Sequence, residues 1–171
     1  IKAKTLWSPS GDSGSKYTAA HGIAVGNFSQ RFNKKVSEDL VKTTINADVV
    51  IEELRGGSIK TTGISSMDCS DLAINGRFTI KPGAISLMQW NRGDQSKTYG
   101  IYMIGSNNTI SITSADIDDS KNGSLSDLIK TDESLWGGKT EKNVLRIGGG
   151  TLKVKENQKE RYLISAAKGF R

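Results

Sequence analysis

The dipeptide Asn75-Gly76 is the strongest local signal in the chain, because it divides an apolar run into two short arms, Leu72–Ile74 and Phe78–Ile80. Asn-Gly readily takes the positive φ angles of a two-residue type I′ turn, which joins antiparallel strands. The pattern therefore predicts a β-hairpin whose two arms are neighbours in one sheet.

Other short apolar runs bounded by Gly, Asn or Pro extend this prediction along the chain; they cover residues 45–54, 58–64, 84–90, 98–104, 109–113, 144–147, 151–154 and 161–166. Such spacing is typical of an antiparallel β-sandwich, either Ig-like or jelly-roll-like. Residues 34–42 and 125–129 have helical spacing of apolar side chains, so one or two short helices are expected. The 171 residues suit a single domain, 1–171, with residues 1–15 as an extended N-terminal arm and no repeat period.

Charge and cysteine content narrow the classes of partner. The 24 basic and 18 acidic residues give a net charge of +6, but the basic residues are scattered and lack interleaved aromatics, so no nucleic-acid binding is expected. Cys69 is the only cysteine, which excludes an intrachain disulfide. No apolar run approaches the roughly 18 residues that span a bilayer, so no membrane insertion is expected.

Catalytic motifs are weak. The segments 11–14 (Gly-Asp-Ser-Gly) and 18–21 (Thr-Ala-Ala-His) imitate parts of a serine protease, but Ser13 precedes His21 by only a few residues, the reverse of the order in that family. The Gly-Gly segments lack the Lys-Ser/Thr of a phosphate-binding loop. The sequence therefore predicts a protein that is not an enzyme, with no catalytic residues and no cofactor.

Three segments are candidate binding sites. Arg92, Gly93 and Asp94 lie between two expected strands, where an exposed loop would present them to a receptor. Trp136, beside Gly137-Gly138, is a candidate exposed aromatic for sugar stacking. Residues 116–123 place oxygen-bearing side chains at alternate positions, as calcium loops do, but they lack the EF-hand glycine. A solvated acidic turn is the favoured interpretation of Asp116, Asp118 and Asn122, and no metal site is predicted.

The N-terminal segment has the pattern of an exchangeable strand. Its alternation places Ile1, Ala3, Thr5 and Trp7 on one face, and the turn-rich residues 8–15 follow. Such a strand is able to insert into another copy of the same chain. The start at Ile is expected of a processed chain or an excised fragment, and an extracellular or cell-surface location, or alternatively a virion, is expected.

This N-terminal pattern and the β-rich class resemble those of subunits of bacterial chaperone–usher fimbriae, although residues 162–171 lack the Gly-Tyr-rich closing strand of a pilin. The first expectation is a structural or adhesive subunit of an extracellular filament, assembled from copies of itself by β-strand exchange. One alternative is a phage or viral tail or fibre protein that binds a host receptor or glycan on the virion. A secreted lectin-like module is the other.

Overall fold

The structure is a computed structural model that describes residues 1–3, 6–7, 19–26, 39–56, 60–81, 85–87, 97–121, 127–132, 140–155 and 162–165. The regular elements in these residues are strands: β1 (Lys2–Ala3), β2 (Leu6–Trp7), β3 (Ala19–Gly26), β4 (Val41–Ile45), β5 (Val49–Ile51), β6 (Leu54–Gly56), β7 (Lys60–Met67), β8 (Ser70–Ile80), β9 (Ile85–Leu87), β10 (Lys97–Ile104), β11 (Thr109–Asp118), β12 (Asp127–Asp132), β13 (Val144–Ile147), β14 (Gly150–Lys153) and β15 (Tyr162–Ser165).

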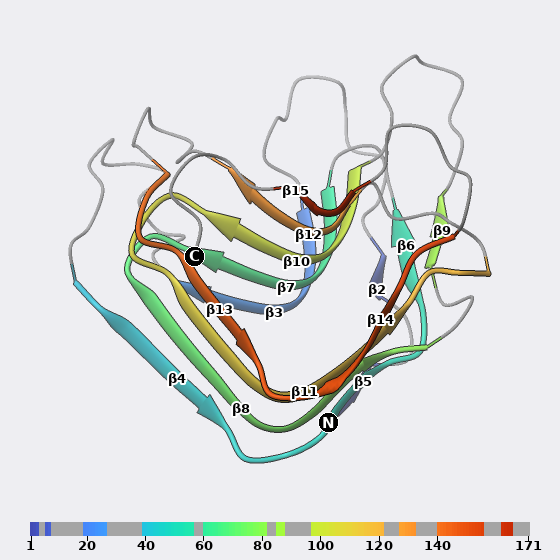
Figure 1. The fold of residues 1–171 in the computed structure, drawn as a ribbon, viewed down its shortest axis with the longest axis horizontal. Coiled ribbons are helices and arrows are strands. Elements are labelled where there is room, and N and C mark those ends of the chain that lie inside the picture. The colour runs from blue at the N-terminus through green and yellow to red at the C-terminus, as the bar shows by residue number, and fades with distance from the viewer. Residues whose placement is uncertain are drawn as a thin grey trace.

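These strands form three parallel sheets. Sheet A contains β1, β5, β8, β11 and β13, with β4 beside β8 and β14 beside β11; sheet B contains β2, β6 and β9; sheet C contains β3, β7, β10, β12 and β15. The chain passes repeatedly through the three sheets, and each pass pairs in parallel with the one before it. The architecture is a parallel β-helix, in which stacked turns share one interior (Figure 1).

The antiparallel sandwich predicted from the sequence is therefore wrong, although the content is mainly β as expected. Local turn signals mark where strands end, but they do not determine which strand lies beside which. All-parallel sheets are otherwise the arrangement of α/β proteins. The fold expected of a fimbrial subunit depends on antiparallel strands, so the parallel sheets contradict the expected pilus-type fold as well.

One or two short helices were expected, at residues 34–42 and 125–129. Residues 34–38 lie outside the described residues, and the rest of that segment includes the start of β4, which is extended. The segment 125–129 runs into β12, a strand that pairs with β10 and β15. The spacing of apolar residues over so short a segment fits the period of a helix as well as that of a strand. Pairing with the neighbouring turns favours the strand.

The predicted hairpin at Asn75-Gly76 is a single strand in the structure. β8 runs continuously through the dipeptide, and the ladder with β11 shifts register there, where sheet A bends (Figure 1). Asn75 Nδ2 donates to Asn46 Oδ1 on the preceding turn at 2.8 Å. A Cβ on Gly76 would lie 2.5 Å from the carbonyl oxygen of Ala47. The glycine therefore allows two turns of the chain to approach closely where the sheet bends. Glycine inside a strand commonly has this role, in place of the hairpin turn that Asn-Gly predicted.

The bend divides sheet A into two arms. The first arm comprises β4, β13 and the first halves of β8 and β11; the second comprises β1, β5, β14 and the second halves of β8 and β11. Both arms send apolar side chains inward at alternate positions. Residues on successive turns stack in register, as Ile45, Ile74, Ile112 and Ile147 do.

The middle strands of sheet C, β7 and β10, are buried on both faces. Ile101 and Met103 of β10 belong to the interior of the β-helix, whereas Tyr99 and Tyr102 form a second apolar cluster with Met67 and Ile104. The run of residues 99–104 is accordingly apolar without alternation, as expected for a parallel strand covered on both faces.

A buried polar ladder connects the turns between sheet C and sheet A. It consists of Ser70, Asn108 and Asn143. The residues before them, Cys69, Asn107 and Lys142, all have positive φ, at 53°, 59° and 57°. The side chains of the ladder satisfy polar groups of the turns, including Asn143 Nδ2, which donates to the Gly105 carbonyl at 2.7 Å. These hydrogen bonds hold the successive turns in register, as the strand pairing does for the sheets.

Candidate functional site

The outer face of the second arm carries a row of alternating charges. Glu52, Lys81, Asp118 and Lys153 each follow the registered interior residues Ile51, Ile80, Ile117 and Leu152. They consequently lie on successive turns of the β-helix, on the outside of sheet A. We call these four residues the charged row.

Glu52 is the acceptor for two lysines. The ammonium groups of Lys2 and Lys81 each lie 2.9 Å from Oε1 of Glu52. Hydrogen bonds from Lys2 and Lys81 lower the pKa of Glu52 to about 2. The carboxylate is therefore ionised at neutral pH, and it connects β1, β5 and β8 across three adjacent strands.

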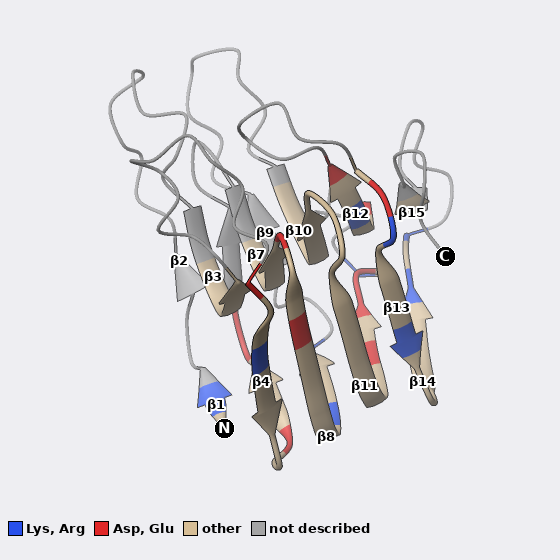
Figure 2. Cartoon of the chain, turned by 90° about the vertical axis from the view of Figure 1, so that its left-hand side faces the viewer, with Lys and Arg blue, Asp and Glu red and all other residues tan. Residues whose placement is uncertain are grey.

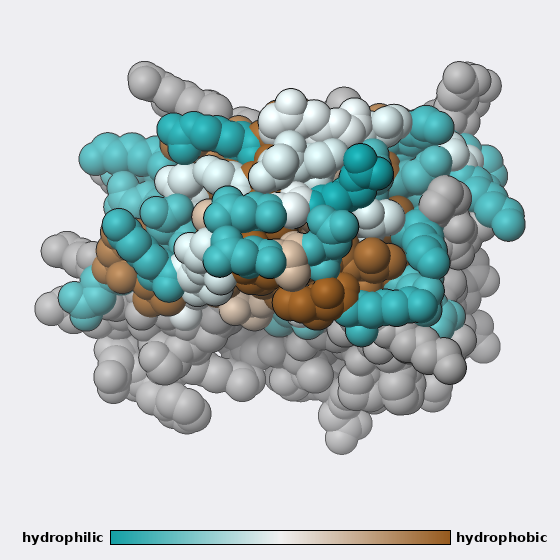
Figure 3. All heavy atoms as spheres, turned by 90° about the horizontal axis from the view of Figure 1, so that it is seen from below, coloured by the Kyte–Doolittle hydropathy of each residue, from teal (hydrophilic) through white to brown (hydrophobic). Residues whose placement is uncertain are grey.

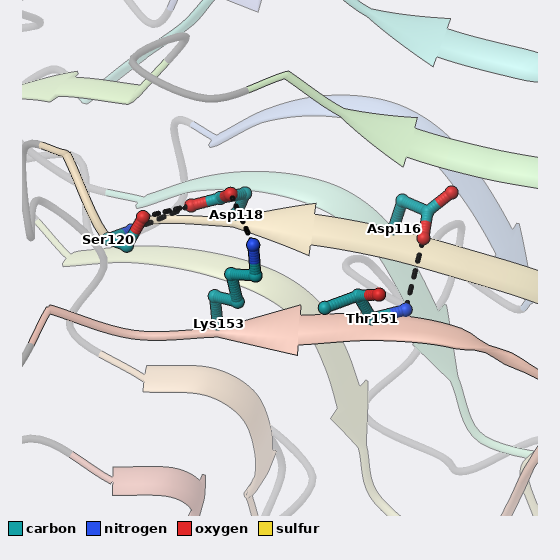
Figure 4. Close-up of polar contacts among 5 residues, drawn as sticks. All are labelled: Asp116, Asp118, Ser120, Thr151 and Lys153. Carbon is teal, nitrogen blue, oxygen red and sulfur yellow. Dashed lines mark hydrogen bonds and ion pairs between the residues drawn. The ribbon is translucent and has the colours of Figure 1, made fainter.

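Asp118 has a comparable set of donors at the other end of the row (Figure 4). Ser120 donates to Asp118 Oδ1 from Oγ at 2.5 Å and from its backbone nitrogen at 3.0 Å. Lys153 Nζ lies 3.7 Å from Asp118 Oδ2. The hydroxyl bond from Ser120 is the main cause that lowers the pKa of Asp118, and the charge of Lys153 contributes.

Asp116 points outward two residues earlier on the same strand (Figure 4). The backbone nitrogen of Thr151 donates to Asp116 Oδ1 at 3.0 Å, and Arg77 Nε lies 3.4 Å from Asp116 Oδ2. Asp116 and Asp118 thus contact different cations and different donors. The two carboxylates therefore have no cation or hydrogen-bond donor in common among these contacts.

The described residues around Asp116 and Asp118 do not form a calcium-binding loop. Both aspartates are in or at the end of β11 and each has a cationic partner, while Asn122 lies outside the described residues. The described part of the chain contains no group of three or more His, Cys, Asp or Glu side chains able to hold a metal ion. Nor does it contain a helix long and apolar enough to cross a membrane.

Neither Glu52 nor Asp118 has the raised pKa of a general acid. A pair of carboxyls that catalyses glycoside or ester hydrolysis needs one member with a raised pKa, so that it remains a proton donor at neutral pH. At Glu52 and Asp118 the pKa is lowered. These groups act as ionised acceptors with fixed geometry.

An open depression adjoins the row at its last described turn. It is lined by Ser120, Leu152, Lys153, Val154 and Lys155. Of these residues, Val154 is exposed, whereas the Ser120 hydroxyl and the Lys153 ammonium group both contact Asp118.

A second cluster of titratable groups lies on the outside of sheet C. The rings of Tyr99 and Tyr102 stack with centroids 4.9 Å apart, and the Tyr102 hydroxyl donates to Asp132 Oδ2 at 3.2 Å. Burial, followed by the nearby Asp127 and Asp132, raises the pKa of Tyr99 to about 12. Tyr99 and Tyr102 are 3% and 1% exposed, so we interpret this cluster as packing.

Most candidate residues predicted from the sequence lie elsewhere. Arg92, Gly93, Asp94, Trp136 and Thr5 fall outside the described residues, and their proposed roles stay predictions. His21, considered as a catalytic base, has Nδ1 2.7 Å from the hydroxyl of Thr62 on the next turn.

The N-terminal strands pair within the chain. β1 pairs with β5, with Ala3 beside Ile51, and β2 pairs with β6, with Trp7 beside Arg55. The amino group of Ile1 donates to the Asp48 carbonyl at 2.6 Å. Insertion of Ile1, Ala3, Thr5 and Trp7 into another copy stays a prediction, but the described strand pairing of this segment is internal.

No motif or spacing in the sequence marks Glu52, Lys81 or Lys153 as members of one row. The corresponding positions on successive turns are separated by unequal lengths: hydrogen-bonded partners lie 29, 38 and 35 residues apart at Asn46–Asn75, Ser70–Asn108 and Asn108–Asn143. A row whose spacing varies this much has no periodic signal in the sequence.

No family model, curated protein sequence or solved structure matches the chain.

Proposed function

We propose that this chain is a structural β-helical module that binds an extended glycan on the outer face of sheet A and is not an enzyme. The proposal corresponds to the glycan-binding alternatives expected from the sequence, whether on a virion or in a secreted module. Stacked turns give solenoid proteins long, continuous binding surfaces, and a polymeric ligand is the chemistry that such a surface fits.

The observation that carries the proposal is the alignment of small and polar side chains across the turns. On the first arm, Thr44, Ala73, Ser111 and Arg146 occupy one outward-facing row. Figure 2 shows few charged residues on this arm, and the surface in Figure 3 is mostly teal and white, with apolar brown in smaller patches. The hydroxyl groups of Thr44 and Ser111 and the guanidinium group of Arg146 are the kinds of donor and acceptor that pair with the hydroxyl groups of a chain of sugars.

The carboxylates of the second arm support binding rather than turnover. Their lowered pKa values keep Glu52 and Asp118 ionised, as acceptors for sugar hydroxyls or for the neighbouring lysines. An extracellular or virion-surface location, the setting expected from the sequence, would expose the module to such glycans.

Binding to immobilised polysaccharides, measured by affinity electrophoresis, tests the proposal. A tryptophan at Ser111, in the middle of the first arm, would obstruct the face between Ala73 and Arg146 and should weaken binding. Glu141→Trp, at an exposed residue in the turn between sheet C and sheet A, is the control and should leave binding unchanged. Equal binding by both variants, or no binding by the wild type to neutral or acidic glycans, would contradict the proposal.

A further inference from the structure

In the part of the chain that the structure describes, β14 is an edge strand of sheet A and pairs with β11 alone. The carbonyl oxygen of Lys153 accepts from the backbone nitrogen of Asp119 at 2.9 Å, so it faces β11. Backbone groups alternate in direction along an extended strand, so the N–H and carbonyl of Leu152 face the opposite way. This outer edge of β14 presents the groups with which another strand would pair.

The apolar row inside the second arm ends at β14 with its last member incompletely covered. Ile51, Ile80 and Ile117 are each 0% exposed, whereas Leu152, which follows them in register, is only partly buried. Val154, two residues further along, is 38% exposed. An apolar side chain on a strand added beside β14 would cover Leu152, as Leu152 covers Ile117, and would remove more apolar surface from water.

The outermost strands of sheet A share one type of charge. β1, β4, β13 and β14 each contain one cation and no carboxylate; the cations are Lys2, Lys42, Arg146 and Lys153. The inner strands β8 and β11 carry carboxylates, and Figure 2 shows the blue segments of β4 and β13 on either side of the red segment of β8. Edge-to-edge pairing of two copies of sheet A would place cations beside cations, so charge disfavours a second copy at this edge.

The charged row indicates what an added strand should carry. Its sign alternates from Glu52 through Lys81 and Asp118 to Lys153. Glu52 shows that one member can pair on both sides, because Lys2 of β1 and Lys81 each lie 2.9 Å from its Oε1. Lys153 contacts Asp118 on the side of β11, at 3.7 Å. The next position in the row lies beyond β14, and a carboxylate there would continue the alternation.

The open depression described above lies along the same edge. Its lining includes Leu152, Lys153, Val154 and Lys155, so apolar and basic side chains alternate along it. Lys155 is exposed and follows Lys153 by two residues, which places the two lysines at alternate positions. A strand that fits this lining carries apolar side chains beside Leu152 and Val154 and acidic side chains beside the lysines.

We propose that the outer edge of β14 docks an extended peptide of a partner protein, in which apolar and acidic side chains alternate. The peptide adds a strand to sheet A, so backbone hydrogen bonds supply affinity and the side chains at alternate positions supply specificity. This site is the edge of the sheet and not the outer face proposed to bind glycans, so either proposal can fail alone.

Fluorescence anisotropy of a short labelled peptide in which valine and glutamate alternate tests the proposal. The wild-type protein should bind it about tenfold more tightly than a peptide with lysine at each glutamate position. A glutamate peptide with a central proline should bind as weakly as the lysine peptide, because proline interrupts the backbone pairing. Binding of the acidic peptide should weaken as the salt concentration rises.

A proline at position 152 tests the backbone contact. Leu152→Pro removes the N–H that faces the outer edge, and proline is tolerated at such positions of edge strands. Leu152→Ala is the matched control, because it truncates the same side chain but keeps the N–H. The proline variant should bind the acidic peptide about tenfold more weakly than the alanine variant does. Urea midpoints establish that both variants remain folded.

A charge reversal tests the acidic partner without altering the backbone. Lys155→Glu should weaken binding of the glutamate peptide about fivefold, because it replaces attraction by repulsion. Lys42→Glu makes the same change at an exposed lysine of β4, on the opposite edge of sheet A, and should leave the affinity within about twofold.

Three outcomes would overturn the inference. Equal affinity for the glutamate and lysine peptides, or equal losses in Lys155→Glu and Lys42→Glu, would refute the acidic partner. Equal binding of the glutamate peptides with and without proline would show that charge alone holds the peptide, and it would refute the added strand. Self-association of the wild type in sedimentation, abolished by Leu152→Pro, would assign this edge to a second copy.

Discussion

The side-chain amide of Asn108 donates to Oδ1 of Asn143 at 2.9 Å, in the buried turn between sheet C and sheet A. Asn108 also donates to the Ile104 carbonyl at 2.8 Å and accepts from the Ser70 hydroxyl at 2.7 Å. One side chain thus connects three successive turns of the β-helix. Its removal would leave polar groups buried without partners, which is costly.

Asn108→Ala should accordingly lower the free energy of unfolding by about 2–4 kcal/mol. The matched control is Asn75→Ala, which removes a solvent-exposed bond to Asn46 and should cost less than about 1 kcal/mol. Urea denaturation of the two variants measures the difference. Similar losses at the two sites would show that the buried ladder is no more important than the exposed pair.

Gly63 should tolerate no side chain. A Cβ there would lie 2.7 Å from the Gly100 carbonyl oxygen and 2.9 Å from Cδ1 of Ile80, between sheet C and sheet A. We expect Gly63→Ala to destabilise the protein by about 1–3 kcal/mol, as other overpacked core substitutions do. Gly149→Ala is the control, because no atom lies within 4 Å of the added carbon, and it should be neutral or slightly stabilising. Thermal unfolding of both variants tests the pair.

The ion pairs of Glu52 predict a defined acid response. Its pKa is lowered from an ordinary value of 4.5 to about 2, so the unfolded chain takes up this proton at higher pH than the folded chain does. The stability that Glu52 contributes is complete above pH 4.5 and is lost as the pH falls through about 2. Glu52→Gln should flatten this part of the stability curve, measured by urea midpoints between pH 5 and pH 2. An unchanged slope in the variant would mean that the two lysines do not hold the carboxylate in solution.

Tyr99 predicts the opposite response in alkali. Burial raises its pKa from 10.0 to about 12, so the folded state keeps the phenol protonated where the unfolded chain would ionise. The corresponding stability is present below pH 10 and is lost as the pH rises through about 12. Phenolate absorbance should therefore rise in step with unfolding, and Tyr99→Phe should reduce the alkaline loss of stability. Ionisation of Tyr99 in a protein that is still folded near pH 10 would refute the buried arrangement.

Some parts of this fold could be predicted from the amino-acid sequence because they depend on neighbours along the chain. The alternating apolar residues in 109–113 and the short apolar runs 98–104 and 144–147 correctly indicated strands at β11, β10 and β13. The run 98–104 also lacked alternation, which is a signal for a parallel strand buried on both faces. At Asn75-Gly76, by contrast, a local preference for a hairpin was outweighed by pairing along the whole of β8 with β4, β5 and β11.

The direction of strand pairing and the membership of the charged row were decided by the tertiary structure alone. Glu52 and Lys81 are neighbours because Ile51 and Ile80 stack inside the β-helix, and Asp118 meets Lys153 for the same reason at Ile117 and Leu152. These contacts depend on how many residues each turn uses between sheets, and that number varies from turn to turn. The sequence by itself determined where the chain is extended and which side chains prefer the interior. The stacking of whole turns alone determined which charges meet on the outside. Burial of the aligned apolar rows drives this stacking, and the buried polar ladder forms the hydrogen bonds that the turns require.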